Sequence, residues 1–156
     1  MKKYIVLFSL LIISLVVIYS CNKAAAPTAF SFVLDGNKVE VDSTYALLYT
    51  YNGSSVSRRQ IQIIAYSQGK QVMEILALAK LGAQPALSDC FITYYNNGGY
   101  NSSDVYVTET GGVNFTKCDT LENIIQGTFS VENAVNSDSL IKVITSGEIY
   151  IDKINR

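Results

Sequence analysis

Turn-forming residues punctuate this chain about every 8 to 12 residues, and short apolar segments lie between them. Beyond the first 20 residues, no segment keeps a 3.6-residue hydrophobic period over about three helical turns. This spacing predicts an all-β fold, an antiparallel β-sandwich or meander of about nine or ten short strands. We place this fold in a single domain over residues 30–156, because the whole chain has the length of one domain.

Several segments make local predictions within this pattern. Residues 35–37 (DGN) and 52–54 (NGS) are typical of tight hairpin turns, and residues 68–70 (QGK) also turn the chain. Residues 72–79 (VMEILALA) contain good helix formers, but the segment is short and glycines flank it, which favours a buried strand. Gly147 interrupts the last apolar run, where we expect a β-bulge.

The N-terminus has the layout of a secretory signal. Lys2 and Lys3 precede an apolar run over residues 4–19, and Ser20-Cys21 follows the run. A transmembrane anchor is the alternative, but this run spans about 24 Å as a helix, less than the roughly 30 Å hydrocarbon core of a bilayer. We therefore predict a signal peptide over residues 1–20.

The residues around the expected cleavage site resemble a bacterial lipobox, with Ile18-Tyr19-Ser20 before Cys21. The resemblance implies that Cys21 is diacylated on sulfur, becomes the new N-terminus and binds membrane lipid through its acyl chains. Residues 21–29 then form a lipidated tether of mostly small residues. We expect a protein anchored in the outer membrane of the cell envelope, and the sequence leaves open whether it faces the periplasm or the cell surface.

Composition argues against several function classes. The chain has no His, the commonest general base and metal ligand. Beyond residue 20 it has ten basic and 13 acidic side chains, a balance that argues against a nucleic-acid partner. We expect no cofactor, no bound metal and no catalytic residues.

Carboxylates are the one enzymatic alternative, because a pair of them can hydrolyse a glycosidic bond. The Asp residues stand singly and mostly at turns, where Asp usually bonds its own backbone. They are Asp35, Asp42, Asp89, Asp104, Asp119 and Asp138. We therefore expect a non-catalytic domain with a binding or structural role, and a carboxylate-based hydrolase, for example a glycan-acting one, is the alternative.

Two cysteines, Cys90 and Cys118, remain after Cys21. In an oxidising compartment an even pair can form a disulfide. Cys also serves as a small buried hydrophobe, so the second interpretation is two separate thiols, which we slightly favour.

Four tyrosines gather around the Asn/Gly/Ser-rich loop 96–103: Tyr94, Tyr95, Tyr100 and Tyr106. Tyr with Asn, Ser and Gly is a recognition composition, although Tyr is also a common strand residue. We expect Val105 and Val107 to face the core and Tyr106 to face outward. The predicted surface suits a glycan or a peptide segment of an envelope protein.

The C-terminal half carries a family resemblance. Residues 124–131 (IIQGTFSV), a polar turn and residues 141–147 (IKVITSG) resemble the C-terminal GTFS…ITSG-type β-hairpin of small lipoproteins of unknown function from Bacteroidota. Residues 32–36 and 113–117 also resemble that family. The resemblance covers nearly all of residues 30–154 and implies a lipid-anchored β domain, with no catalytic residues to carry over.

Three tripeptides that begin at Asp42, Asp119 and Asp138 resemble the O-glycosylation acceptor of extracytoplasmic Bacteroidota proteins. Their acceptor residues are Ser43, Thr120 and Ser139. Each tripeptide also suits an Asx-type turn, which is the more general interpretation.

Overall fold

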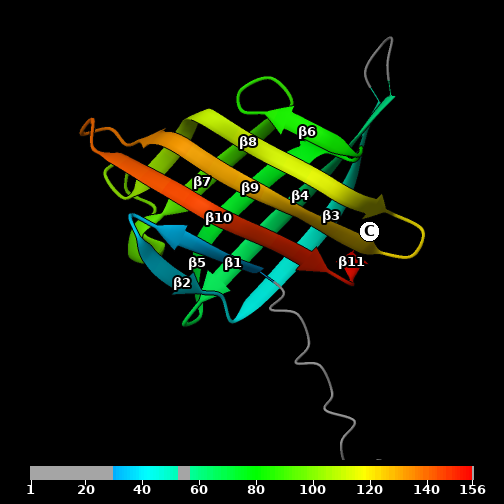
Figure 1. Ribbon diagram of the computed structural model, residues 1–156, viewed down its shortest axis with the longest axis horizontal. Coiled ribbons are helices and arrows are strands. Elements are labelled where there is room, and N and C mark those ends of the chain that lie inside the picture. The colour runs from blue at the N-terminus through cyan, green and yellow to red at the C-terminus, as the bar shows by residue number, and fades with distance from the viewer. Residues whose placement is uncertain (1–29, 53–56, 156) are drawn as a thin grey trace, which may run out of the picture.

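The protein is built almost entirely from β-strands, which confirms the all-β prediction (Figure 1). The computed structural model describes residues 30–52 and 57–155. The strands are β1 (Phe30–Leu34), β2 (Asn37–Glu40), β3 (Ser43–Asn52), β4 (Ser57–Ser67), β5 (Lys70–Leu78), β6 (Gly82–Pro85), β7 (Cys90–Tyr95), β8 (Val105–Asp119), β9 (Ile124–Val135), β10 (Ile141–Ile151) and β11 (Ile154–Asn155). A 3₁₀ turn, η1 (Asn96–Gly98), follows β7.

The N-terminal predictions concern residues outside the described part of the chain. The signal peptide, Cys21 and the tether all lie before residue 30. Within the part of the chain that is described, no helix is long and apolar enough to cross a membrane.

The strands form one sheet in the order β11-β3-β4-β5-β7-β8-β9-β10-β1-β2, and β6 pairs with β8 outside this path. Most neighbours are antiparallel and consecutive in the chain, so the meander describes the fold better than the sandwich. Among the described strands, β11 departs from the antiparallel pattern, because it runs parallel to β3.

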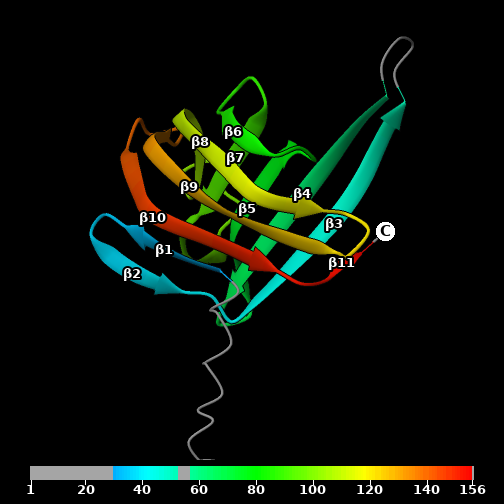
Figure 2. The ribbon, with the colours of Figure 1, turned by 45° about the vertical axis from the view of Figure 1, so that its right-hand side comes forward.

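The sheet curls into a half-barrel. β2 and β3 stand near opposite ends of the strand order, yet only two residues separate Glu40 from Ser43. A flat sheet cannot meet this constraint, because neighbouring strands lie about 4.8 Å apart and the strands between β2 and β3 would hold them roughly 40 Å apart. Figures 1 and 2 both show β8, β9 and β10 crossing over β3, β4 and β5.

The predicted glycine turns position two of the hairpins. Asp35 and Gly36 between β1 and β2 have φ of 48° and 83°, and Gln68 and Gly69 between β4 and β5 have φ of 52° and 73°. Two consecutive positive φ values are the signature of a type I′ turn, whose twist matches that of the flanking strands. Part of the third predicted turn, at 52–54, lies outside the described residues.

The ambiguous segment 72–79 is a strand, as predicted, and lies almost entirely in β5. β5 pairs with β4 on one side and with β7 on the other. Met73, Ile75 and Ala77 alternate toward the core and are fully buried. Pairing on both sides therefore outweighs the helix propensity of Met, Glu, Leu and Ala.

The predicted bulge at Gly147 is present in β10, where the register to β9 shifts between Ile144 and Gly147. Ser146 takes the left-handed conformation there, with φ of 50°. Gly147 faces the interior, and an added Cβ would lie 2.5 Å from the ring of Phe129. The missing side chain lets β10 approach the core closely.

Aromatic side chains fill the inside of the half-barrel. The ring of Phe30 lies 5.1 Å from that of Phe129, and Phe32 lies 6.1 Å from Phe129 and 6.3 Å from Tyr94. Buried aliphatic side chains from the opposite wall complete this core: Ile61, Ile63, Ile75 and Ile92.

Candidate ligand-binding surface

The four tyrosines predicted as a surface divide between the inside and the outside of the sheet. Alternation along β7 turns Tyr94 inward and Tyr95 outward. Tyr94 and Tyr106 are 7% and 4% exposed and belong to the core. Neither ring is available to a ligand, so both are removed from the candidate surface.

The prediction for the strand after the loop was wrong. Val107 is 43% exposed, whereas Tyr106 points inward. Tyr106 stands directly opposite Tyr94 across the β7–β8 pair, and their ring centroids lie 6.0 Å apart. These two rings fill a wide interior better than two valines would. This packing decides which residues of β8 face the core.

Tyr95 and Tyr100 remain on the outside and contact each other. Their ring centroids lie 5.5 Å apart. Tyr100 is 72% exposed on the loop after η1, and its hydroxyl donates a long hydrogen bond of 3.4 Å to Gln71 on β5. The two rings therefore form a small aromatic platform beside β5.

Polar side chains extend this platform across four strands. The Tyr95 hydroxyl donates to one oxygen of Glu74 at 2.9 Å, and the Gln62 amide donates to the other at 2.5 Å. Gln62 in turn accepts a hydrogen bond of 2.8 Å from the Tyr49 hydroxyl. We call these five residues, Tyr49, Gln62, Glu74, Tyr95 and Tyr100, the tyrosine ladder.

The hydrogen bonds that Glu74 accepts join diagonal rather than directly opposed positions. Glu74 stands opposite Thr93, two residues before Tyr95, and Gln62 stands opposite Leu76, two residues after Glu74. Diagonal neighbours on one face of a sheet are within reach of long side chains. The register of β3, β4, β5 and β7 therefore builds the ladder.

The phenol of Tyr95 is held in its neutral form. Partial burial, the hydrogen bond to Glu74 and the charge of that carboxylate raise the pKa of Tyr95 to about 12. At neutral pH this hydroxyl donates to Glu74 and still has lone pairs free to accept from a ligand. Glu74 thereby fixes the orientation of the ring that packs against Tyr100.

Further aromatic side chains lie on the outer face of the same strands. Phe91 shares its face with Tyr95 and is 47% exposed. Tyr45 on β3 is 52% exposed and packs edge-on against Tyr66, with ring centroids 5.7 Å apart. The alternation Tyr45-Leu47-Tyr49 in the sequence could have revealed the β3 contribution, but only the register links it to Glu74.

Four of the six carboxylates predicted at turns have hydrogen-bond or ion-pair partners there. Asp35 pairs with Lys142 and Asp89 with Lys80, each at 2.6 Å. Asp119 accepts two hydrogen bonds of 2.9 Å from the backbone of its own turn, which lower its pKa, and Asp42 accepts one from the Gln68 N–H. Within the described residues, no group of three or more His, Cys, Asp or Glu side chains could hold a metal ion.

The two cysteines are free thiols, so the disulfide interpretation is wrong. β7 and β8 pair only from Thr93 to Tyr95, and Cys90 precedes this stretch. Cys118 stands opposite Ile125 on β9. Burial raises the pKa of both thiols, as expected for small buried side chains.

The predicted glycosylation acceptors lie in three different surroundings. Ser43 is exposed at the start of β3, Ser139 is exposed in the β9–β10 turn with φ of 60°, and Thr120 is partly buried in the β8–β9 turn. Asp119 caps its own turn, in agreement with the Asx interpretation, whereas Asn136 rather than Asp138 caps the β9–β10 turn.

An open groove of about 850 Å³ lies on β6, β8, β9 and β10. Small residues line most of it, among them Gly111, Gly112 and Ser130, and Glu148 is the one charged side chain among its lining residues. Its lining includes none of the predicted tyrosines and no cluster of titratable groups.

Comparison with known protein families, curated proteins and solved structures finds no match to this chain. The resemblance to small Bacteroidota lipoproteins therefore stays a prediction.

Proposed function

We propose that this protein is an envelope lipoprotein, anchored in the outer membrane through Cys21, whose β domain binds a ligand without catalysing a reaction. The tyrosine ladder is the proposed binding surface. The observation that carries this proposal is the unbroken row of hydrogen bonds from Tyr49 through Gln62 and Glu74 to Tyr95, which fixes phenol and amide groups on an outer face. Rigid rings beside fixed donors and acceptors are a recognition surface.

The surroundings of the carboxylates support a non-catalytic role. Paired acids in glycoside hydrolysis stand about 5–10 Å apart in one cleft. Asp35, Asp89 and Asp119 instead occupy separate turns, each bonded to its own partner. Both oxygens of Glu74 already accept hydrogen bonds within the ladder.

The chemistry of the ladder suits a glycan or a polar peptide segment of an envelope protein. Phenol rings offer flat apolar surface, and the amide and carboxylate groups offer hydrogen bonds to hydroxyls or to a peptide backbone. The acidic balance beyond residue 20 disfavours anionic polymers such as nucleic acid.

The binding proposal is tested by immobilising the full-length protein in a neutral detergent and measuring what it retains from an envelope extract and from a panel of oligosaccharides. Tyr100→Ala should reduce retention at least tenfold with an unchanged melting temperature, because an exposed loop ring supports little packing. Leu121→Ala, at an 85% exposed position in another turn, is the matched control and should retain as much as the unmodified protein. Equal retention by both variants would remove the ladder as the binding surface.

The anchor is tested separately. Mass spectrometry of the protein from membranes should show an N-terminal diacylated Cys21 with residues 1–20 removed, and Cys21→Ser should abolish that species. Recovery of the protein with residues 4–19 retained would contradict the anchor.

A further inference from the structure

The Glu74 carboxylate accepts hydrogen bonds but has no positive partner in the described part of the chain. None of the three ion pairs among the described residues includes it. Its directly opposed neighbours are Ile64 on β4 and Thr93 on β7, and Leu76 follows it on the same face of β5. Lys70 is the nearest basic residue on its own strand and stands four residues away, about 13 Å along β5. Glu74 therefore places an unpaired negative charge on a partly apolar outer face.

This carboxylate decides the direction of the hydrogen bonds in the ladder. A carboxylate only accepts, so the Tyr95 hydroxyl and the Gln62 amide both donate to it, at 2.9 Å and 2.5 Å. Because the NH₂ group of Gln62 is turned toward Glu74, its oxygen is turned toward Tyr49, whose hydroxyl donates at 2.8 Å. The phenol protons of both tyrosines are therefore used within the protein.

The hydrogen-bonding capacity that the ladder leaves free is almost all acceptor capacity. The third phenol, that of Tyr100, also donates within the protein. Free lone pairs remain on both Glu74 oxygens and on the three phenol oxygens. One N–H of the Gln62 amide is the donor that the ladder can still offer within the described residues. Such a surface favours a ligand rich in donors and disfavours an anion, whose oxygens only accept.

The rings of Tyr95 and Tyr100 add a second feature that favours a cation. Their centroids lie 5.5 Å apart, with 55° between the ring planes. The hydrogen bond from Tyr95 places this pair of rings beside the Glu74 carboxylate. The face of an aromatic ring attracts a cation within about 6 Å of the ring centroid. A carboxylate and two ring faces at one place are complementary to an ammonium group.

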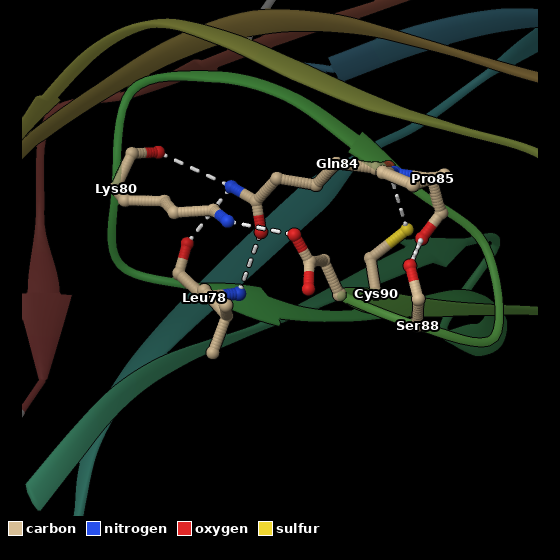
Figure 3. A network of polar contacts seen from close by, with 7 residues as sticks. Leu78, Lys80, Gln84, Pro85, Ser88 and Cys90 are labelled. Atoms are coloured by element: carbon tan, nitrogen blue, oxygen red, sulfur yellow. Dashed lines mark hydrogen bonds and ion pairs between the residues drawn. The ribbon is translucent and has the colours of Figure 1, made fainter. Parts of the chain in front are cut away.

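The strand that carries Glu74 is held in place before any ligand binds. β5 pairs with β4 on one side and with β7 on the other. At the end of β5, the side chain of Gln84, which is 1% exposed, accepts a hydrogen bond of 2.8 Å from the Leu78 N–H (Figure 3). It also donates to the carbonyl oxygens of Leu78 at 3.0 Å and Lys80 at 3.1 Å. Groups on such a fixed strand lower the ordering cost of binding.

We propose that the tyrosine ladder binds an amino sugar with a free amine, whose ammonium group contacts Glu74 and the rings of Tyr95 and Tyr100. This inference rests on the proposed binding function and narrows its ligand class. The three N–H donors of the ammonium group match the free lone pairs of the carboxylate and the phenols, and the sugar hydroxyls supply further donors. A peptide backbone is a poorer match, because it brings one acceptor for each donor and the ladder has one free donor.

The experiment titrates the full-length protein in neutral detergent with a linear glucosamine trimer and with the matched N-acetylglucosamine trimer, by isothermal titration calorimetry. At about pH 6 the glucosamine amines are protonated and an ordinary carboxylate is ionised. Saturable binding of the glucosamine trimer is expected, and acetylation, which removes the positive charges, should weaken binding at least tenfold. No saturable binding of the glucosamine trimer, or equal affinities of the two trimers, would overturn the proposal.

Variants test the carboxylate. Glu74→Gln should weaken binding of the glucosamine trimer at least tenfold. Glu148→Gln removes an exposed carboxylate on β10, three strands beyond β7 in the sheet order, and should leave the affinity within twofold. Equal losses in the two variants would overturn the site.

Variants of Tyr100 test the ring face without disturbing the fold, because this side chain is 72% exposed. Tyr100→Phe keeps the ring and should hold the affinity for the glucosamine trimer within twofold, whereas Tyr100→Leu should lower it at least threefold. Circular dichroism melting of both variants should match the unmodified protein. Equal affinities of the two variants would contradict the contact between the ring and the ammonium group.

Two further arms separate this inference from its alternatives. N-acetylated trilysine amide carries three ammonium groups, like the glucosamine trimer, and should bind more weakly. Equal or tighter binding of this peptide would overturn the amino sugar and assign the ladder to a basic peptide. Retention of an envelope component that is lost in Tyr100→Ala, without binding of the glucosamine trimer, would keep the ladder as a binding surface and overturn only its amine ligand.

Discussion

Glu74 is the residue on which the ladder depends. Its two oxygens accept from different strands, the Tyr95 hydroxyl on β7 and the Gln62 amide on β4. A hydrogen bond to a charged acceptor is about twice as strong as one between neutral groups. One carboxylate therefore fixes the orientation of side chains on both sides of β5.

Replacing Glu74 with Gln should lower the pKa of Tyr95 from about 12 toward the ordinary phenol value, without reaching it. Burial is the largest cause of the raised value and persists in the variant, whereas the charge and the charged acceptor are lost. NMR titration of ¹³C-labelled tyrosine measures this shift. Thr93→Val, at the directly opposed position on β7, is the control and should leave the Tyr95 pKa in place. An unchanged pKa in Glu74→Gln would contradict the ladder.

The same raised pKa fixes the sign of a pH effect on stability. A phenol whose pKa is higher in the folded protein contributes to the free energy of unfolding. This contribution is complete at pH values below the pKa of the unfolded state, about 10. This contribution is lost as pH rises from about 10 toward the folded value of about 12. Urea unfolding should show the loss in the unmodified protein and a smaller loss in Tyr95→Phe, which cannot ionise. Identical slopes for the two proteins in this range would contradict the assignment.

Gln84 is the buried polar residue that closes the corner between β5 and β6. Gln84→Ala should reduce the free energy of unfolding by about 2–3 kcal/mol, because the Leu78 N–H and the Lys80 carbonyl lose their partner in a mostly buried site. The Leu78 carbonyl loses one of its two hydrogen bonds and keeps the one from the Lys80 N–H. Urea unfolding measures this. Ser88→Ala, which removes one exposed hydrogen bond of 3.3 Å, should change the same quantity by less than about 0.5 kcal/mol. Equal effects of the two substitutions would contradict a structural role for the Gln84 amide.

Individual strands were predictable where local chemistry decides them. The Asp35-Gly36 turn follows from backbone conformations that few residues adopt, and Gly147 marks a bulge where the chain leaves no room for a side chain. Alternation alone could not predict which side chains of β8 face the core, because both Tyr106 and the valines beside it suit a core. The aromatic partner of Tyr106 on β7 decides it, and that partner depends on register. The contacts of Glu74 were missed for the same reason.

Gly147→Ala tests the close approach of β10 to the core. The added methyl group would lie 2.5 Å from both the ring and the carbonyl oxygen of Phe129, so we expect a loss of about 3 kcal/mol in the free energy of unfolding. Gly69→Ala is the matched control, because an added Cβ there meets nothing within 4 Å and only the φ of 73° is strained. It should cost about 1 kcal/mol. A smaller loss at Gly147 than at Gly69 would contradict the tight packing of the bulge.

At the scale of the whole molecule, the half-barrel places the hydrophobic core and the proposed binding surface on opposite faces of the sheet. Phe30, Phe32 and Phe129 fill the inside, and the ladder lies outside on β3, β4, β5 and β7. Under the proposed anchor, the nine residues 21–29 reach about 30 Å at full extension. The domain would then stay near the membrane, with the proposed ligand surface on the wall formed by these strands.

The most direct test of a ligand surface is photo-crosslinking in the cells that express the protein. p-Benzoylphenylalanine replaces Tyr100 in one variant and Leu121 in the other, since both side chains are highly exposed. On illumination, the variant with the probe at position 100 should form a discrete adduct of higher mass, and the variant with the probe at position 121 should not. An adduct of equal yield at both positions, or none at position 100, would contradict a binding surface at the tyrosine ladder.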